Sequence, residues 1–553
     1  MGKRVLIVGG VAGGASCAAR LRRLDETADI HIFDRGPHVS FANCGLPYFV
    51  GDVIADERSL LMASSELFRQ RFNIATHTRH EVLAIDPARH SIRVRDLTTG
   101  GERDTTYDAL VLAPGAAPIR PVMPGIDLPG IFAVRTIPDS VRIRTWITER
   151  TPRRALVVGG GFIGLEMAEN LAHRGLAVTV LEKLPQVMPP LDPEMAAPVA
   201  EHLRAKGVLL ALGDGLAGFE GDGSAIVAHT ESGARIAADL VILAIGVRPE
   251  TTLAKAAGLS LGPRGGIVVD AQMRTSAPDI WAVGDAVEVI DVVTGQETMA
   301  PLAGPANRQG RLAADVIAGR TTGFRGVQAT AVVGVFGLTV ATTGASEKGL
   351  ARAGVEHAQA VYLHPGHHAG YFPGATPIHL KLLFDTRDGR VLGAQAVGLE
   401  GVEKRIDVVA TAIQLGGTVR DLAQAELCYA PQFGAAKDPV NLAGMIATNH
   451  LAGDMPLADW RALGNGDHLV VDVREPDEYA AGHIPGALNV PLSVLRERWE
   501  VLPRDRPIVC CCGVGQRAYY AVRFLAQHGV EAANLSGGYT TYRALVASGV
   551  LRA

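Results

Sequence analysis

The sequence predicts an α/β protein organised around two Rossmann-like dinucleotide-binding domains. Two glycine-rich turns, at residues 9–14 and 159–164, each follow a β-branched apolar run and precede a helical pattern. A carboxylate, Asp34 or Glu182, ends the next apolar strand about 20 residues beyond each turn. Near the end of the chain, a third glycine-containing loop begins at Cys512 and indicates a separate C-terminal unit.

Length and composition narrow the function class. A chain of 553 residues is long enough for roughly three to five domains. The net charge of −4, from 53 basic and 57 acidic residues, disfavours nucleic acid or an anionic membrane as a partner. Six cysteines do not form a disulfide framework in a chain of this length, which favours a reducing, cytoplasmic location. No stretch approaches the ~20 apolar residues of a membrane span.

The first dinucleotide unit begins at the N-terminus. Residues 3–8 predict a strand, residues 9–14 a tight turn, and the following alanine-rich segment a helix through Leu24. A second strand at residues 30–33 leads to Asp34, whose carboxylate suits a ribose hydroxyl. Val11 occupies the middle glycine position of the G-x-G-x-x-G pattern. The free N–H groups of the helix start predict a pyrophosphate site.

The second unit satisfies the glycine pattern in full. Residues 155–158 predict its first strand, and residues 178–181 predict the strand that leads to Glu182. Glu182 should bind the adenosine ribose and repel a 2′-phosphate, which favours NADH, although the adjacent Lys183 partly offsets that repulsion. Strands that run into turns at residues 107–115 and 240–246 follow the two units.

A cysteine lies in a short polar turn soon after the first unit. Cys44 is a candidate redox thiol, since a helix start or a bound cofactor can lower the pKa of a thiol. Pro47 and Phe49 exclude the C-x-x-C and C-x4-C patterns, so Cys44 has no resolving cysteine in this segment. A catalytic Cys44 must therefore form a sulfenic acid or a mixed disulfide with another thiol. The alternative is a buried structural cysteine.

Residues 275–285 resemble the second flavin motif of the FAD-dependent pyridine nucleotide-disulfide oxidoreductases, and the resemblance covers residues 1 to about 445. The lone Cys44 is similar to that of the single-cysteine branch, which contains coenzyme A-disulfide reductases, NADH oxidases and NADH peroxidases. Peroxide-reducing members carry a histidine in the first glycine turn, where this chain has Ala12. The resemblance therefore favours a thiol substrate over peroxide.

The glycine turns and the resemblance together assign the binding residues. Arg20 and Arg23 lie on one face of the first helix and can pair with phosphates, although such arginines are also common on solvated faces. The resemblance places coenzyme A against Ser16, Arg20, Arg23, Ser40, Asn43, Asn307 and Arg311. FAD and NADH or NADPH are expected at Gly9, Gly10, Val11, Ala12, Gly13, Gly14, Asp34, Arg35, Ala113, Gly115, Gly159, Gly161, Ile163, Gly164, Glu182, Gly246, Gly284 and Asp285.

The pattern changes to strands at residues 329–336, 378–385 and 390–397, then a helix near Gly401. This segment resembles the α+β dimerisation domain of the family, which implies a homodimer. In that family the counterparts of Tyr371 and Tyr429 approach the redox cysteine across the dimer, where a phenol can donate a proton to the leaving sulfur. The alternative role is aromatic packing. No metal site is expected from the histidines of this loop, which lack tetrahedral spacing and a carboxylate; they are His364, His367 and His368.

Residues 451–456 predict a linker, and the segments 470–479, 482–487 and 510–517 resemble an α/β rhodanese domain. The loop from Cys512 to Arg517 presents successive N–H groups before a helix, which stabilises a thiolate or persulfide on the cysteine. Structural roles are expected for the buried motif residues Asp472 and Arg474 and for the strand cysteines Cys510 and Cys511.

The expected domains are residues 1–149 with 247–324 for FAD, 150–246 for NAD(P)H, 325–448 for dimerisation and 456–553 for the rhodanese unit. The resemblance implies an NAD(P)H-dependent flavoenzyme that reduces coenzyme A disulfide or persulfide through Cys44, while Cys512 transfers sulfane sulfur from small-molecule donors. Three alternatives stay open: an oxidase or peroxidase that cycles Cys44 through sulfenic acid, a rhodanese unit that only carries persulfide to a partner protein, and a reductase passing single electrons to a redox protein.

Overall fold

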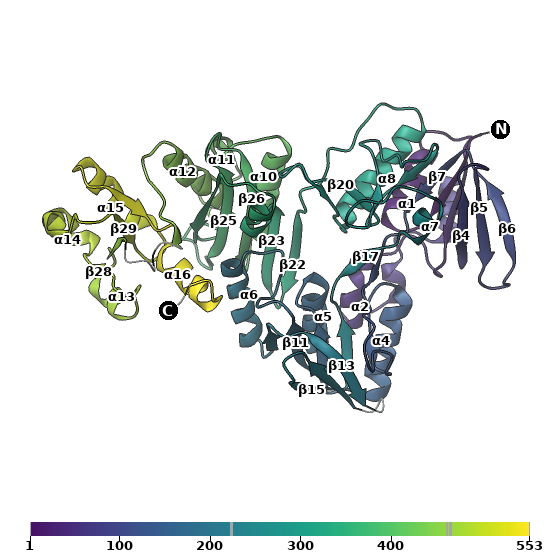
Figure 1. Ribbon diagram of the computed structural model, residues 1–553, viewed down its shortest axis with the longest axis horizontal. Coiled ribbons are helices and arrows are strands. Elements are labelled where there is room, and N and C mark those ends of the chain that lie inside the picture. Colours follow the sequence, from purple (N-terminus) through teal and green to yellow (C-terminus); the bar gives the residue numbers. More distant parts are fainter. Residues whose placement is uncertain (1, 222–224, 461–462, 464–466, 552–553) are drawn as a thin grey trace. The chain divides into compact units, whose positions relative to one another are not determined.

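The computed structural model describes residues 2–221, 225–460, 463 and 467–551. The contacts divide the chain into two compact units, residues 1–183 with 208–327 and residues 184–207 with 328–553. The first unit contains both glycine turns, and the second contains the C-terminal cysteine loop. Figure 1 labels many of the elements of both units.

The first sheet of the first unit is parallel, in the order β19-β7-β1-β2-β3. Its central strand β1 is buried from Val5 to Val8, because both faces of a parallel sheet are covered. The helices α1 (Ala12–Arg22) and α8 (Ala303–Ile317) pack together so closely that a Cβ at Gly310 would lie 2.1 Å from the Gly13 carbonyl oxygen. The strands are β1 (Arg4–Val8), β2 (Asp29–Asp34), β3 (Ala75–Thr78), β7 (Ala109–Leu112) and β19 (Ile280–Ala282).

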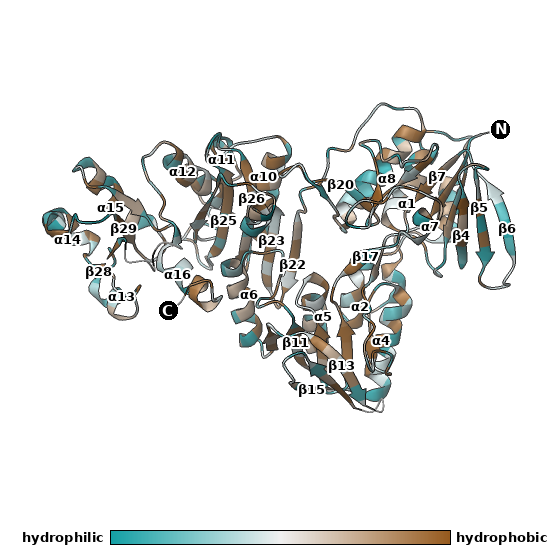
Figure 2. Cartoon of the chain, viewed as in Figure 1, coloured by the Kyte–Doolittle hydropathy of each residue, from teal (hydrophilic) through white to brown (hydrophobic). Residues whose placement is uncertain are grey.

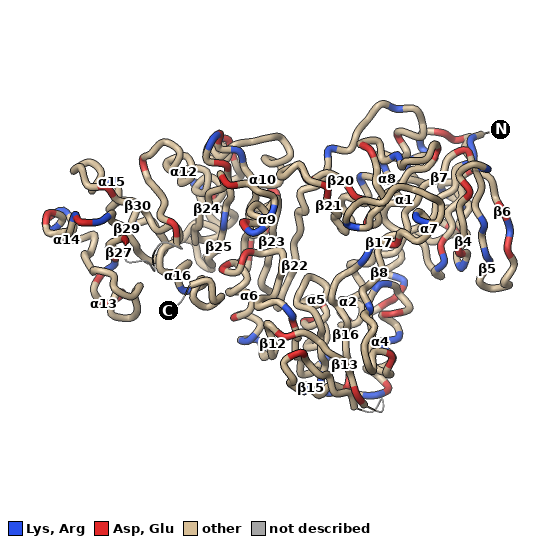
Figure 3. Tube along the Cα trace, in the orientation of Figure 1, with Lys and Arg blue, Asp and Glu red and all other residues tan. Residues whose placement is uncertain are grey.

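Antiparallel strands extend this part of the chain. Strand β6 is polar and exposed, and it appears in teal in Figure 2. Charges alternate along β5 and β6 (Figure 3), where Arg93 and Arg95 pair across the strands with Asp104 and Glu102. Antiparallel pairing joins β4 (His80–Asp86), β5 (Ser91–Asp96) and β6 (Glu102–Thr106). A second small sheet pairs β20 (Val287–Ile290) with β21 (Glu297–Thr298) in antiparallel fashion and with β18 (Ile267–Val268) in parallel.

A second parallel sheet follows the same plan, in the order β12-β11-β10-β16-β9. Helix α5 (Phe162–His173) starts within the second glycine-rich segment, at its fourth residue, and gives the turn-to-helix order that the pattern predicts. Helix α4 (Ile137–Arg150) begins at a capping box between Thr136 and Asp139. The strands of this region are β9 (Ile131–Phe132), β10 (Arg154–Val158), β11 (Ala177–Glu182), β12 (Leu209–Leu212), β13 (Leu216–Gly221), β14 (Ile226–Thr230), β15 (Arg235–Ala238) and β16 (Leu240–Leu243).

The second unit contains an antiparallel sheet in the order β22-β23-β26-β25-β24. Two of its strands, β23 and β24, are absent from the sequence-based prediction. The strands are β22 (Ala331–Val335), β23 (Leu338–Gly344), β24 (Ala358–Leu363), β25 (Ile378–Asp385) and β26 (Val391–Gly398). The helices are α6 (Pro193–Ala205), α9 (Glu347–Arg352), α10 (Val402–Gln414), α11 (Val419–Gln424) and α12 (Pro439–Leu451).

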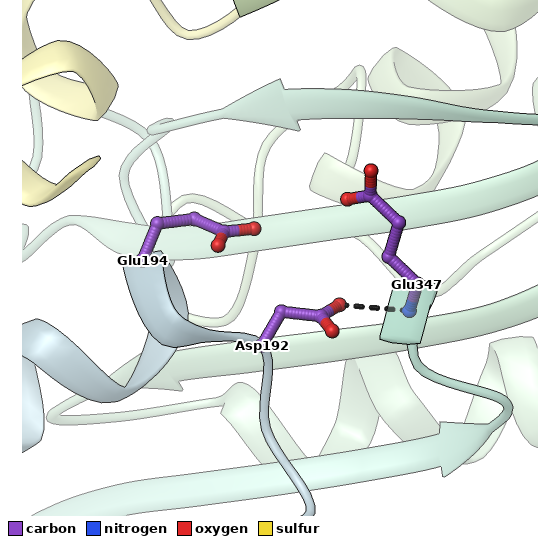
Figure 4. Close-up of side chains that lie close together, drawn as sticks. All are labelled: Asp192, Glu194 and Glu347. Atoms are coloured by element: carbon purple, nitrogen blue, oxygen red, sulfur yellow. Dashed lines mark hydrogen bonds between the residues drawn. The ribbon is translucent and has the colours of Figure 1, made fainter. Parts of the chain in front are cut away.

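A buried lysine neutralises a cluster of carboxylates in this unit. Asp192, Glu194 and Glu347 point toward one another in Figure 4, and the Nζ atom of Lys381 lies 2.8, 2.6 and 2.7 Å from their oxygens. Lys381 is fully buried. Burial acts to raise the pKa of Asp192, but the charge and hydrogen bond of Lys381, together with the backbone N–H groups of Glu347 and Lys348, lower it overall. The ammonium group therefore occupies the place where these carboxylates would hold a cation, and it ties α6 to β25 and α9.

The C-terminal part of the second unit is a parallel sheet in the order β28-β27-β29-β30. The predicted linker is packed rather than free, since Met455 is buried in the same apolar cluster as Val471. The strands are β27 (Leu469–Asp472), β28 (Leu488–Asn489), β29 (Ile508–Cys511) and β30 (Ala532–Asn534). The helices are α13 (Pro476–Ala480), α14 (Leu492–Arg498), α15 (Gln516–Gln527) and α16 (Gly538–Ala547).

Candidate active sites

The Cys44 thiol lies in a short 3-10 turn that the first glycine turn holds in place. The turn η1 (Asn43–Gly45) runs directly into helix α2 (Leu46–Val50). The backbone N–H of Ser40 donates to the Gly10 carbonyl at 2.7 Å, and Ser40 has a φ of 49°. Cys44 is a free, exposed thiol. The chain thus presents a solitary thiol beside its first dinucleotide turn.

Two carboxylates that the sequence did not associate with the thiol act on it. Partial desolvation raises the pKa of Cys44, and the negative charges of Glu166 and Asp285 raise it further. The Tyr48 hydroxyl donates to Glu166 at 3.1 Å, and burial raises the pKa of Glu166. The protein groups alone therefore act against thiolate formation. The lowered pKa of Cys44 that the sequence analysis considered therefore requires positive charge supplied by a bound group.

The first glycine turn is closed by Asp34. Its two carboxylate oxygens accept from the Gly10 and Gly36 N–H groups at 2.9 and 2.8 Å. Gly9 has a φ of 95°, and a Cβ there would lie 2.1 Å from the Ala113 carbonyl oxygen. Only glycine fits that conformation and spacing. The neighbouring Arg35 is paired at 3.0 Å with Glu250, so its guanidinium is already engaged.

The second turn has the same construction around Glu182. The Gly160 N–H donates to the Glu182 carboxylate at 2.7 Å, and Glu182 is only 8% exposed. A Cβ at Gly161 would meet no atom within 4 Å, so packing does not require glycine there. The open space at this position fits the close approach of a dinucleotide. Lys183 is paired with Glu231 at 2.8 Å, so its ammonium is engaged with a carboxylate other than Glu182.

Asp285 and an unpredicted arginine lie close enough to interact electrostatically. Burial raises the pKa of Asp285, and the charge of Arg135 opposes that rise. Arg135 donates to the Pro114 carbonyl at 3.2 Å, and burial lowers its pKa. The Gly284 N–H donates to Gln309 at 2.7 Å. The half-buried guanidinium of Arg135, among residues near the first dinucleotide turn, suits an anionic cofactor. No motif in the sequence identifies Arg135.

Five of the seven residues expected to bind coenzyme A lie on α1, at its C-cap or on α8, whereas Ser40 and Asn43 lie in the segment of Cys44. Ser16 donates to Asn307 at 2.5 Å across the two helices. Arg20 is paired with Asp315 at 2.7 Å, with both side chains largely buried, so its charge is already neutralised. Arg23 and Arg311 are exposed. The structure therefore leaves Arg23 and Arg311 as the more accessible cations of the expected set.

The two tyrosines expected near a redox thiol form a pair in the second unit. Their hydroxyl oxygens lie 2.8 Å apart, and the side chains of Tyr371 and Tyr429 are 76% and 49% exposed. The hydrogen bond between the two hydroxyl groups raises the pKa of Tyr371. Because both rings are exposed, an aromatic packing role within this chain is not supported.

The three loop histidines make separate contacts with protein groups. His364 bonds to His379 at 2.7 Å and to Thr541 at 2.9 Å. His367 contacts Thr376 and lies 3.3 Å from the Glu400 carboxylate, a partner that the sequence did not suggest. His368 bonds to the Ala369 carbonyl at 3.0 Å.

The Cys512 loop forms an N–H cradle at the start of α15. The Gly515 N–H donates to the Cys512 Sγ atom at 3.1 Å. The Cys512 carbonyl accepts from the Tyr539 N–H at 2.7 Å, and a Cβ at Gly538 would lie 2.2 Å from that same oxygen. Arg517 makes a two-pronged ion pair with Glu478, a residue that the sequence reasoning passed over. This geometry stabilises negative charge on one sulfur atom.

The other motif residues of this part have structural contacts. Asp472 and Arg474 are buried and paired at 2.6 Å, and Arg474 also donates to the Gly482 carbonyl at 2.7 Å. Cys510 and Cys511 are buried on β29, and burial raises the pKa of Cys510 to about 12. These contacts agree with the structural roles expected from the sequence.

Two dinucleotide turns closed by carboxylates, with a solitary thiol beside the first, define a nucleotide-dependent thiol oxidoreductase. The chain belongs to the pyridine nucleotide-disulphide oxidoreductase family, whose profile matches residues 3–310. The dimerisation-domain profile of that family matches residues 330–439, and a rhodanese-like domain profile matches residues 459–545. The expected α/β fold class, with dinucleotide-binding, dimerisation and C-terminal rhodanese domains, is thereby confirmed.

Two individual relatives show which kinds of enzyme the first four fifths of the chain resemble. The coenzyme A disulfide reductase of Staphylococcus haemolyticus is 33% identical over 80% of this chain and 99% of its own length. An NADH oxidase of Methanocaldococcus jannaschii is 37% identical over 81% of this chain and 99% of its own.

Solved structures extend the likeness through the C-terminal domain. The reduced Bacillus anthracis CoADR-RHD is 46% identical with a TM-score of 0.96, covering 99% of this chain and 98% of that one. The NAD-dependent persulfide reductase from A. fulgidus is 36% identical with a TM-score of 0.90, covering 98% of this chain and 100% of that one. In the described residues, no helix combines the length and apolarity needed to cross a bilayer.

Proposed function

We propose that the protein is an FAD-containing, NAD(P)H-dependent reductase of coenzyme A disulfide and persulfide, and that its rhodanese domain transfers sulfane sulfur through Cys512. The observation that carries the proposal is the pair of distinct thiol sites in one chain. Cys44 is solitary and exposed beside a dinucleotide turn, and Cys512 lies in an N–H cradle. The relatives named for coenzyme A disulfide and for persulfide support this substrate class.

The chain supplies the thiol chemistry at Cys44. The Cys44 thiolate attacks a sulfur of coenzyme A disulfide, which forms a mixed disulfide and releases one coenzyme A thiolate. With coenzyme A persulfide, attack at the sulfur bonded to carbon forms the same mixed disulfide and releases hydrosulfide. FAD, when bound, supplies the two electrons of the nicotinamide hydride that cleave this mixed disulfide. The cleavage regenerates the Cys44 thiolate and frees the second coenzyme A thiolate, which takes up a proton.

The remaining residues bind and orient the reactants. The glycine turns with Asp34 and Asp285 hold FAD, and Gly159, Gly161, Gly164 and Glu182 hold the nicotinamide nucleotide. Exposed Arg23 and Arg311 bind the phosphates of coenzyme A. We assign proton donation at the leaving thiolate to the Tyr371 and Tyr429 pair of the second subunit of a homodimer.

The proposal includes an organisation and a location. The domains are residues 1–149 with 247–324 for FAD, 150–246 for NAD(P)H, 325–448 for dimerisation and 456–553 for sulfur transfer. The scarcity of cysteine favours the cytoplasm. The partners are small-molecule thiols and sulfane-sulfur donors.

The test is anaerobic NADH consumption with coenzyme A persulfide and with coenzyme A disulfide. We expect turnover with both substrates in the wild type, and loss of turnover in Cys44→Ser. Cys428→Ser removes the other exposed thiol of the chain and is the matched control. A tenfold preference between the substrates corresponds to about 1.4 kcal/mol of transition-state stabilisation. Retained turnover in Cys44→Ser would contradict the proposal.

An NADH oxidase cycling Cys44 through sulfenic acid is the second candidate, because one relative carries that name and Cys44 is solitary. Ala12 in the first glycine turn weighs against it. Trapping of Cys44 by a sulfenate reagent during aerobic turnover, without turnover on either coenzyme A substrate, would favour this candidate over the reductase.

A further inference from the structure

The loop that carries Cys512 contains one cation, and its charge is already matched. Arg517 donates from Nη1 and Nη2 to the two carboxylate oxygens of Glu478, each at 2.6 Å. Glu478 belongs to α13 and precedes Arg517 by 39 residues in the sequence. The hydrogen bonds from Arg517 lower the pKa of Glu478 to about 2, so the carboxylate is ionised at neutral pH. The pair therefore contributes almost no net charge beside the thiol.

The second arginine of the region is matched as well. Arg474 is paired with Asp472 at 2.6 Å, and the two side chains are 6% and 1% exposed. Arg474 is fixed further by its bond to the Gly482 carbonyl. Within the described residues of the C-terminal domain, the two arginines that interact with the consecutive cysteines Cys511 and Cys512 thus each have a carboxylate partner.

The sulfur therefore meets one neutral backbone donor and the matched Arg517, which also forms a side-chain hydrogen bond with Cys512. The Gly515 N–H points at Sγ, and the 12-residue helix α15 starts at the next residue. A helix start carries roughly half a unit of positive charge. The exposed Val514 side chain adds apolar surface to the loop. Such a site can balance a single negative charge on the sulfur. It has little positive charge left to balance a sulfur donor that carries two further negative charges.

We infer that Glu478 sets the donor selectivity of the sulfur-transfer site: by neutralising Arg517 it favours persulfides, which carry one negative charge at the reacting end, over the thiosulfate dianion. This inference rests on the proposed role of Cys512 as the acceptor of sulfane sulfur and names its substrate class. Glu478 acts through Arg517 and is a positioning residue.

The transfer balances without an external oxidant or reductant. The Cys512 thiolate attacks the terminal sulfur of RSS⁻, the Sγ–S bond forms, the donor S–S bond breaks, and RS⁻ leaves. Thiosulfate would react in the same way with sulfite as the leaving group, but two negative charges must then approach the thiolate. Like charges at contact distance disfavour that encounter in a half-buried site.

The test is donor-dependent loading of Cys512 in the full-length chain carrying Cys44→Ser, followed by peptide mass spectrometry. The donors are glutathione persulfide and thiosulfate. We expect a second-order loading rate at least tenfold higher with the persulfide. Glu478→Gln should raise the thiosulfate rate at least fivefold and change the persulfide rate less than twofold. Asp477→Asn, an equal charge change on the exposed neighbour in α13, should alter neither rate.

Glu478→Asp retains the charge and serves as the second variant, so its thiosulfate rate should stay near the wild-type value. Equal loading by the two donors in the wild type would overturn the inference while leaving the proposed sulfur transfer intact. An equal loss of both rates in Glu478→Gln would also overturn it, since Glu478 would then only align Arg517. Failure of both donors to load wild-type Cys512 would contradict the proposed sulfur transfer itself, and the inference with it.

Discussion

Removal of the Glu182 carboxylate should change the choice between the two nicotinamide nucleotides. Glu182 is almost fully buried and accepts from the Gly160 N–H at 2.7 Å, so its charge is fixed at the turn. A hydrogen bond from a ribose hydroxyl to such a carboxylate is worth about 1.5–3 kcal/mol. Glu182→Ala should therefore lower kcat/KM for NADH by about 10- to 150-fold. The same change removes repulsion of the 2′-phosphate, so kcat/KM for NADPH should rise.

Lys183→Ala provides the matched control. Its ammonium is paired with Glu231 on the surface, and an exposed pair of this kind contributes about 0–1 kcal/mol. We expect the nucleotide preference to change less than about fivefold in this variant. The assay is steady-state NADH and NADPH oxidation at constant ionic strength. An equal loss of activity with both nucleotides in Glu182→Ala would contradict a role of Glu182 in nucleotide choice, because it would assign Glu182 to holding the turn alone.

Three further predictions concern folding and binding. Gly161→Ala should leave Tm unchanged, since the added Cβ meets open space. The same variant should raise the Kd for NADH in a titration, because the methyl group enters the space for the dinucleotide. A fall in Tm would contradict this prediction. Lys381→Met should destabilise the fold by about 3–5 kcal/mol in denaturant, because two buried carboxylates and the partly exposed Glu347 lose their partner. The matched change at an exposed lysine, Lys206→Met, should not destabilise the fold, and equal effects of the two variants would contradict this prediction. Burial and, to a smaller extent, the charge of His379 lower the pKa of His364 from 6.5 to about 3. Between these two pH values the unfolded state therefore binds a proton at this histidine that the folded state does not bind. Stability should fall toward acid by up to about 1.4 kcal/mol per pH unit, and His364→Asn should flatten this slope; an unaltered slope would refute it.

The dinucleotide turns were predictable because their requirements are local. Gly9 and Gly159 adopt positive φ, and each would clash with a carbonyl oxygen if it carried a Cβ. The spacing to Asp34 and Glu182 follows from one helix and one strand, so the sequence alone places both carboxylates at their turns. The same reasoning located the Cys512 loop between a strand and a helix.

The residues that sequence reasoning missed act across long separations. Glu166 meets Tyr48 from a helix 118 residues away, and Glu478 meets Arg517 from 39 residues away. Arg135 lies outside every motif, and only the fold brings it to the first turn. No periodicity or spacing encodes such contacts. The omitted strand β23 follows β22 after a two-residue turn, so the pair reads as a single apolar run.

The proposed reduction depends on a mixed disulfide between Cys44 and coenzyme A. The most direct measurement is peptide mass spectrometry of the reduced enzyme after anaerobic reaction with coenzyme A disulfide and an acid quench, without NADH. We expect a coenzyme A adduct on the Cys44 peptide, absent in Cys44→Ser and unchanged in Cys428→Ser. An enzyme that consumes NADH with coenzyme A disulfide while Cys44 stays unmodified would contradict the account.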